Sequence, residues 1–100
     1  MNKQTIIEIS RLLANPTRLE ILEWLKAPEK NFPPHEVVKG FEDGVCVTYI
    51  QRKAGLSQST ISTYLSNMSK CGLLTLTRHG KWSYFKRNEE TLKAYSAFFL

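Results

Sequence analysis

Short hydrogen-bonding side chains gather along one face of the segment Ser57–Cys71. At helical spacing this polar face consists of Gln58, Ser59, Ser62, Thr63, Ser66, Asn67 and Lys70. Glutamine can pair with adenine through two hydrogen bonds, and serine or threonine can meet either base or the thymine methyl group. We therefore predict that side chains near the N-terminal end read DNA bases, namely Gln58, Ser59, Ser62 and Thr63. Contacts to the DNA backbone are expected from Thr60, Asn67 and Lys70.

The opposite face of the same segment is apolar. Ile61, Leu65 and Met68 recur at spacings of four and three residues, which makes one stripe of the width that a helix needs to pack on a core. A plain solvent-exposed helix is the alternative interpretation. Such a helix usually carries Glu and Lys pairs, whereas this one uses serine and threonine, which are mediocre helix formers.

The cysteines and histidines are the other side chains that could do chemistry. Cys46 and Cys71 are too few for a disulfide scaffold and are expected to be free thiols. A metal needs clustered ligands, and neither His35 nor His79 has a ligand partner at metal spacing. We therefore expect no metal and no cofactor. With no paired-carboxylate, Ser/His/Asp or phosphate-loop pattern, the sequence does not predict an enzyme.

The charges are unevenly placed along the 100 residues, whose formal net charge is +5. Residues 1–44 carry six basic and seven acidic side chains. Residues 45–88 carry no acid and seven bases, which are Arg52, Lys53, Lys70, Arg78, Lys81, Lys86 and Arg87. A basic half without acids favours a polyanionic partner over a merely solubilising surface, which would tolerate mixed signs.

Two helices are predicted in the N-terminal part. Ile6, Ile9 and Leu13 recur at helical spacing within residues 3–13. Asn15 and Pro16 then read as the N-cap and first residue of a second helix, which Pro28 stops. Residues 28–34 should form a proline-broken loop, with a short helical turn over 35–39 and an apolar strand over 45–47.

The elements around the polar helix make a known combination. Thr48 and Gln51 fit a capping box that opens a brief helix, Gly55 ends it, and Ser57 caps the next one. This is a helix-turn-helix pattern. Alternating residues over 74–77 and 82–85, joined by a His79-Gly80 turn, then predict a β-hairpin with basic residues near its tip. We expect Arg78, His79 and Lys81 to form a wing that reaches phosphates or the minor groove, although His79 is as readily a simple turn residue.

The last predicted helix begins after a cap at Asn88 and presents an apolar face. A terminal helix on a small domain needs a partner surface, and the first helix has a similar face. The chain also lacks an apolar run long enough to span a membrane and lacks a secretory signal pattern at its start, so a cytoplasmic location and no membrane partner are expected.

Together these blocks resemble the ArsR family of small winged-helix repressors. The resemblance is carried by residues 13–22 (LANPTRLEIL), 55–62 (GLSQSTIS), 71–74 (CGLL) and 80–85 (GKWSYF). It implies a homodimer held by the first and last helices, which binds a partly palindromic operator and represses transcription. The interface residues expected on this basis are Ile6, Ile9, Leu13, Leu92, Tyr95 and Phe99.

One departure from the family concerns metal sensing. Many members bind metals through a Cys-x-Cys pair before the recognition helix, whereas here Cys46 holds the first position and Thr48 the second. A single thiolate cannot chelate a metal. Cys46 is therefore either a plain buried residue, which is the simpler interpretation, or a redox-responsive thiol.

The predicted fold is mainly α with a β-hairpin, a single winged helix-turn-helix domain over residues 1–100 that dimerises through its terminal helices. The predicted function is sequence-specific binding of double-stranded DNA by a homodimeric transcriptional regulator. The alternative is a winged-helix module that binds proteins, which would need an exposed apolar patch on the 57–71 helix or on the wing.

Overall fold

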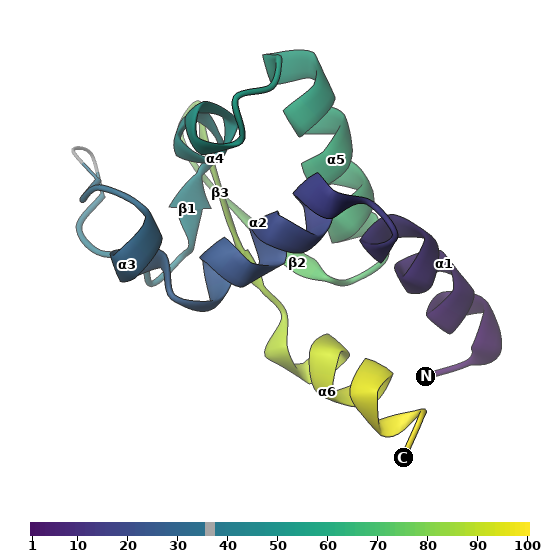
Figure 1. Ribbon diagram of the computed structural model, residues 1–100. Helices are drawn as coiled ribbons and strands as arrows, with labels where there is room; N and C mark the ends of the chain where they lie inside the picture. Colours follow the sequence, from purple (N-terminus) through teal and green to yellow (C-terminus); the bar gives the residue numbers. More distant parts are fainter. Residues whose placement is uncertain (36–37) are drawn as a thin grey trace.

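The computed structural model describes residues 1–35 and 38–100. Within these residues the chain forms six helices and one antiparallel sheet with the strand order β1-β3-β2 (Figure 1). The elements are α1 (Lys3–Leu13), α2 (Pro16–Lys26), α3 (Pro28–Asn31), β1 (Val45–Cys46), α4 (Val47–Ala54), α5 (Gln58–Lys70), β2 (Leu74–His79), β3 (Trp82–Arg87) and α6 (Glu89–Ala97). This arrangement confirms the mainly helical class with a hairpin. The strand expected over residues 45–47 is present as the two-residue β1, which pairs with β3, whereas Val47 already belongs to α4.

Side-chain caps fix the start of most of the longer helices. The side chains of Asn15, Ser57 and Asn88 each accept a hydrogen bond from the backbone N–H three residues ahead, at 3.1–3.2 Å. All three caps were expected from the sequence and are confirmed. Each satisfies a donor that the helix itself leaves unpaired, which is worth about 1 kcal/mol.

The start of α4 differs from the prediction. The helix begins at Val47, and its N-cap Cys46 makes no side-chain cap. The predicted capping box of Thr48 and Gln51 is therefore wrong. The amide of Gln51 instead donates to the backbone oxygen of Leu56 at 2.7 Å, beyond the C-cap Gly55 (φ 68°). Gln51 thus stabilises the turn that leads into α5.

The hairpin turn is shifted by one residue from the prediction. His79 pairs with Trp82, so the two turn residues are Gly80 and Lys81. Gly80 has φ 61°, the left-handed conformation that favours glycine. A two-residue hairpin turn of type II′ places glycine at its first central position, which explains why the turn starts one residue later than expected.

The segment after α2 contains more helix than expected. Pro28 ends α2 as predicted but also opens the single turn α3, where proline lacks only an N–H that would be unpaired anyway. The short helical turn expected over residues 35–39 includes residues outside the described ranges.

The core lies between α2, α4, α5 and the sheet. Its members are apolar, and those without solvent contact are Ile9, Ile21, Val45, Ile50, Ile61, Leu65, Met68 and Leu73. Burying each such side chain contributes about 1.5–3 kcal/mol. The core thereby fixes α5 and the hairpin relative to each other.

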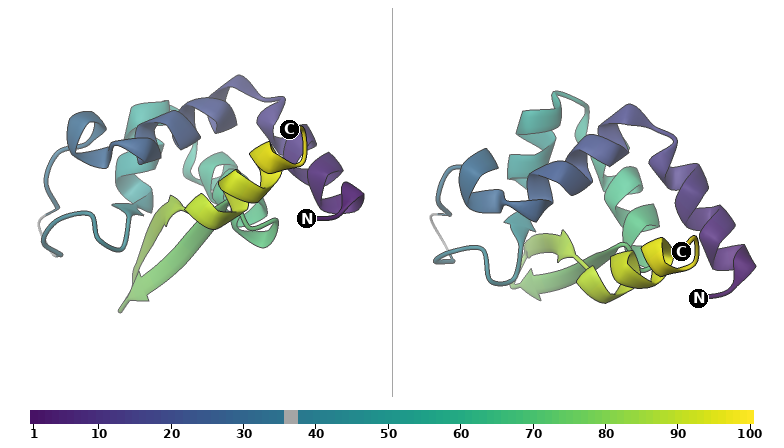
Figure 2. Two further views of the ribbon diagram at one scale, coloured as in Figure 1. Left: turned by 90° about the horizontal axis from the view of Figure 1, so that it is seen from below. Right: turned by 60° about the horizontal axis from the view of Figure 1, so that its bottom comes forward.

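The terminal helices lie side by side at one end of the molecule (Figures 1 and 2). The hydroxyl groups of Ser10 in α1 and Tyr95 in α6 are 2.7 Å apart and share a hydrogen bond. α6 has no fully buried residue. No helix among the described residues is long and apolar enough to cross a membrane.

Candidate nucleic-acid interface

The polar face of α5 is at the surface, as the sequence predicts. Ile61, Leu65 and Met68 are all fully buried and hold the helix on the core. Opposite them, the side chains of Gln58, Ser59, Ser62 and Thr63 are exposed. The helix thus presents hydroxyl and amide groups to solvent from a rigid base.

α2 holds the N-terminal half of α5 in place through Tyr64. The side-chain amide of Asn15 donates to the Tyr64 hydroxyl at 3.3 Å. The guanidinium of Arg18 lies 4.8 Å from the centre of the Tyr64 ring, a cation–π contact. This positioning role could not be predicted from the sequence, because the partners are more than 40 residues apart and nothing in their local pattern pairs them.

A groove of about 510 Å³ runs between α5 and the hairpin. Its lining from α5 is Gln58, Ser62, Ser66, Ser69 and Lys70. Its lining from the hairpin is Leu76, Arg78, Lys81, Ser83 and Phe85. The described lining therefore has three cationic side chains and no carboxylate, a combination suited to a phosphate backbone next to base edges.

The pleat of the hairpin separates the predicted wing residues. Arg78 pairs with Ser83, and both side chains line the groove. His79 pairs with Trp82 on the opposite face. There the His79 Nε2 lies 2.7 Å from the Asp43 carboxylate, with both side chains partly exposed. Asp43 could not be predicted as a partner of His79 from the sequence, because the two residues are 36 positions apart.

The other predicted backbone contacts lie outside the centre of the groove. The hydroxyl of Thr60 accepts a hydrogen bond from Ser57 at 2.9 Å and so belongs to the helix cap. Asn67 is exposed and lines a shallow pocket toward α1 with Glu8 and Arg11. The structure therefore brings Lys70, rather than Thr60 or Asn67, together with the wing.

Both cysteines are free thiols in the structure. Cys46 is buried, and its backbone N–H donates to His35 Nε2 at 3.2 Å. Cys71 is half-buried, and this burial raises the pKa of its thiol. Among residues 1–35 and 38–100, no three His, Cys, Asp or Glu side chains lie close enough together to hold a metal ion.

The residues expected at a dimer interface fall into two groups. Ile6 and Ile9 are buried within the chain itself, and Leu13, Leu92 and Tyr95 are half-buried. Only Phe99 is well exposed, at 62%. Further apolar side chains are exposed on α1 and just after α6 that were not among the expected interface residues, which are Ile7, Phe98 and Leu100.

Comparisons with known proteins place the chain among transcription regulators. It is 44% identical over 86 residues to the uncharacterized HTH-type transcriptional regulator YbzH of Bacillus subtilis, and the match covers 86% of each chain. It is 30% identical over 87 residues to the arsenical resistance operon repressor ArsR2 of Halobacterium salinarum, covering 87% of this chain and 62% of the relative. No protein-family model matches the chain.

A solved structure shares the fold. It is the homodimeric winged helix-turn-helix DNA-binding domain Mb0332 of Mycobacterium bovis, with a TM-score of 0.67 and 21% identity. The match covers 95% of this chain and 75% of that one. The helix-turn-helix of α4 and α5 with the β2–β3 wing is therefore a winged helix.

Proposed function

Because the chain belongs to the ArsR family of winged helix-turn-helix transcription regulators, we propose that it binds specific double-stranded DNA sequences as a homodimer and represses transcription. Residues 1–100 would act as a single DNA-binding domain. The observation that carries this proposal is the groove, in which the polar face of α5 meets the cations of the wing. No catalytic step, metal or cofactor is part of the proposal, and the expected location is the cytoplasm.

In the proposed complex, the N-terminal half of α5 enters the major groove. Gln58, Ser59, Ser62 and Thr63 would read base edges, since they are exposed and lie opposite the buried stripe. Lys70, Arg78 and Lys81 would bind phosphates, with lesser backbone contacts from Thr60, Asn67 and His79. Because His79 is engaged by Asp43, it would support the wing more than it contacts DNA.

The homodimer would form through α1 and α6. The exposed apolar side chains at this end of the molecule are Ile7, Phe98, Phe99 and Leu100. The similar domain of Mycobacterium bovis is a homodimer. A twofold axis between the subunits would place two α5 helices on successive half-sites, so the operator should be partly palindromic. Ile6 and Ile9 would act by shaping α1 rather than by direct contact.

A protein-binding role for the same surface has less support. It would need an exposed apolar patch on α5 or the wing. Leu76 is the one large apolar side chain of the described groove lining that is exposed. Its cross-strand partner Phe85 is buried, and most of the remaining lining consists of serines and cations.

The proposal is tested by binding to the DNA upstream of the protein's own gene. Replacing Gln58 by Ala should weaken specific binding about tenfold, since a two-bond contact to a base is worth about 1–3 kcal/mol. Glu23→Gln is the control, because Glu23 is exposed on α2, outside the groove lining and outside the terminal helices. Fluorescence anisotropy with labelled DNA gives both affinities.

The salt dependence of the same measurement gives a second criterion. If each subunit neutralises about four phosphates, log K should fall with log salt at a slope near −7 for the dimer. An affinity that is independent of salt, or equal for unrelated DNA sequences, would overturn the proposal.

A further inference from the structure

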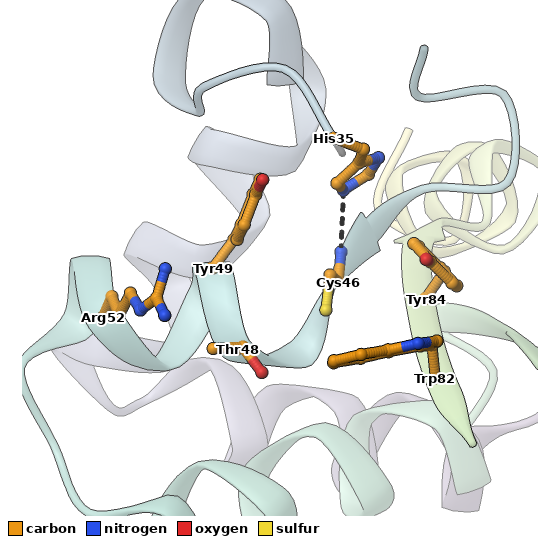
Figure 3. Close-up of a pocket in the computed structure, with 7 residues that line it drawn as sticks. All are labelled: His35, Cys46, Thr48, Tyr49, Arg52, Trp82 and Tyr84. Atoms are coloured by element: carbon orange, nitrogen blue, oxygen red, sulfur yellow. Dashed lines mark hydrogen bonds between the residues drawn. The ribbon is translucent and has the colours of Figure 1, made fainter. Parts of the chain in front are cut away.

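The opposite face of the hairpin closes a second cavity, of about 220 Å³, between α4 and the sheet (Figure 3). Its lining consists of His35, Cys46, Thr48, Tyr49, Arg52, Trp82 and Tyr84. Trp82 and Tyr84 enter it from β3, and Thr48, Tyr49 and Arg52 from α4, as Figure 3 shows. None of these side chains has a place in the proposed DNA contacts.

The walls of this cavity are already held in position. His35 Nδ1 donates to the Gly40 oxygen at 3.0 Å, and its Nε2 accepts from the Cys46 N–H. The Tyr49 hydroxyl donates to the Pro34 oxygen at 2.9 Å. Because these polar groups bond to the backbone, His35 and Tyr49 present ring surfaces to the cavity. Preformed walls of this kind are typical of small-molecule sites.

The chemistry of the walls is aromatic and cationic. The rings of Tyr49 and Tyr84 lie 5.0 and 5.2 Å from the His35 ring, centre to centre, and the Trp82 indole forms the opposite wall. Arg52 supplies a guanidinium at the rim, and the described lining contains no carboxylate. Aromatic faces favour a flat ring, and a guanidinium favours a carboxylate, which it can bind through two parallel hydrogen bonds.

We propose that this cavity binds a small aromatic carboxylate, with the ring between Tyr49 and Trp82 and the carboxylate on Arg52. The volume is below the roughly 300–1,000 Å³ of sites for drug-sized ligands, so the occupant should have one or two rings.

Strand β3 links this cavity to the DNA-facing groove. Trp82 and Tyr84 line the cavity, whereas Ser83 and Phe85, which alternate with them, line the groove. A ligand that fits the cavity better in one position of β3 would therefore shift the wing and alter DNA affinity. This regulatory step rests on the proposed function, but binding of the ligand does not.

Direct binding can be measured without DNA. In a Trp24→Phe background, Trp82 is the only tryptophan of the chain and reports on the cavity by fluorescence. Benzoate should change this fluorescence saturably. Benzamide has no charge and cyclohexanecarboxylate has no aromatic ring, so each should bind about fivefold more weakly or worse.

Two neighbouring cations of α4 provide a matched pair of variants. Arg52→Gln should weaken benzoate binding about fivefold, the range expected for an exposed ion pair. Lys53→Gln should leave benzoate binding unchanged. Lys53 is also exposed, but its ammonium lies over the ring at position 24 and does not line the cavity. No saturable benzoate binding, or equal losses in the two variants, would overturn the proposed site.

The effect of the cavity on DNA binding is tested by measuring how benzoate and DNA change each other's affinity. If the cavity regulates the groove, saturating benzoate should change the affinity for the upstream DNA about threefold or more, and DNA should change benzoate affinity by the same factor. Benzoate binding together with unchanged DNA affinity would overturn the regulatory step alone. If the protein binds benzoate but no specific DNA, the proposed function fails while the aromatic-acid site stands.

Discussion

Arg78 and His79 are neighbours in sequence but act on opposite faces of the wing. Arg78 lines the groove, whereas His79 bonds to Asp43 in the loop before β1. Because both partners of that contact are partly exposed, solvent screens it and its contribution to stability is at most about 1 kcal/mol. Its effect is therefore on the orientation of the wing more than on the stability of the fold.

Cys71 should react with alkylating reagents at higher pH than an ordinary thiol. Burial raises its pKa because the thiolate would lose hydration, and the raised pKa lowers the thiolate fraction at any given pH. In a Cys46→Ser variant, the rate of alkylation by iodoacetamide should still rise at pH values where N-acetylcysteine has levelled off. Mass spectrometry of samples quenched at successive times measures this rate.

The urea-unfolded variant is the control, and its alkylation should follow the pH profile of N-acetylcysteine. If the folded and unfolded profiles coincide, burial does not govern the reactivity of Cys71.

Side chains that follow a local pattern could be predicted from the sequence, and those paired across the fold could not. The buried stripe of α5 and the cap at Ser57 depend on residues within a few turns of one helix. Asp43, Tyr64 and His35 act through partners far away in the chain, and their spacing carries no sign of it. The sequence likewise did not show that the hairpin turn begins at Gly80 rather than at His79.

Among the elements, the hairpin and the loop before it depend on two glycines in different ways. Gly80 and Gly44 both have positive φ, at 61° and 104°. A Cβ at Gly80 would meet nothing within 4 Å, whereas a Cβ at Gly44 would lie 2.2 Å from the Phe85 oxygen. Gly80 is thus required only by the backbone conformation of the turn. Gly44 is required both by its backbone conformation and by its close packing against β3.

Alanine substitutions should separate these two requirements. Gly80→Ala should lower the free energy of unfolding by about 1 kcal/mol, the cost of holding an alanine in a left-handed conformation. Gly44→Ala should cost about 3 kcal/mol or more, because the backbone of β3 must also move. Urea denaturation followed by circular dichroism compares the two variants.

Gly55→Ala is the control, since Gly55 also has a positive φ of 68° and a Cβ there would meet nothing within 4 Å, so its loss should match that of Gly80→Ala. Equal losses for the alanine variants at positions 44 and 80 would show that the contact with Phe85 does not constrain the loop.

At the scale of the whole molecule, the apolar surface is concentrated at one end. α6 has no fully buried residue, and Phe98 and Phe99 are 47% and 62% exposed. The contact between Ser10 and Tyr95 keeps this helix against α1. Substitutions of the exposed Phe98 and Phe99 should therefore have little effect on the core, which lies around α2, α4 and α5.

Replacing both Phe98 and Phe99 by Ser should therefore dissociate the proposed dimer without unfolding the subunit. Sedimentation equilibrium should give the mass of one 11.5 kDa chain for this variant and twice that mass for the unmodified protein. Lys93→Ser, at an exposed position of the preceding helix α6, is the control and should remain a dimer. A variant that stays dimeric would exclude this end as the interface.

The alternation of side chains along the hairpin has a consequence for how such regulators diverge. Positions 82 and 84 line the aromatic cavity, and positions 78 and 83 line the groove. A substitution on one face leaves the chemistry of the other face intact, because neighbouring side chains of a strand point in opposite directions. Gene duplication could thus yield two regulators that keep one operator and respond to different metabolites, each change requiring only a few codons of the same strand.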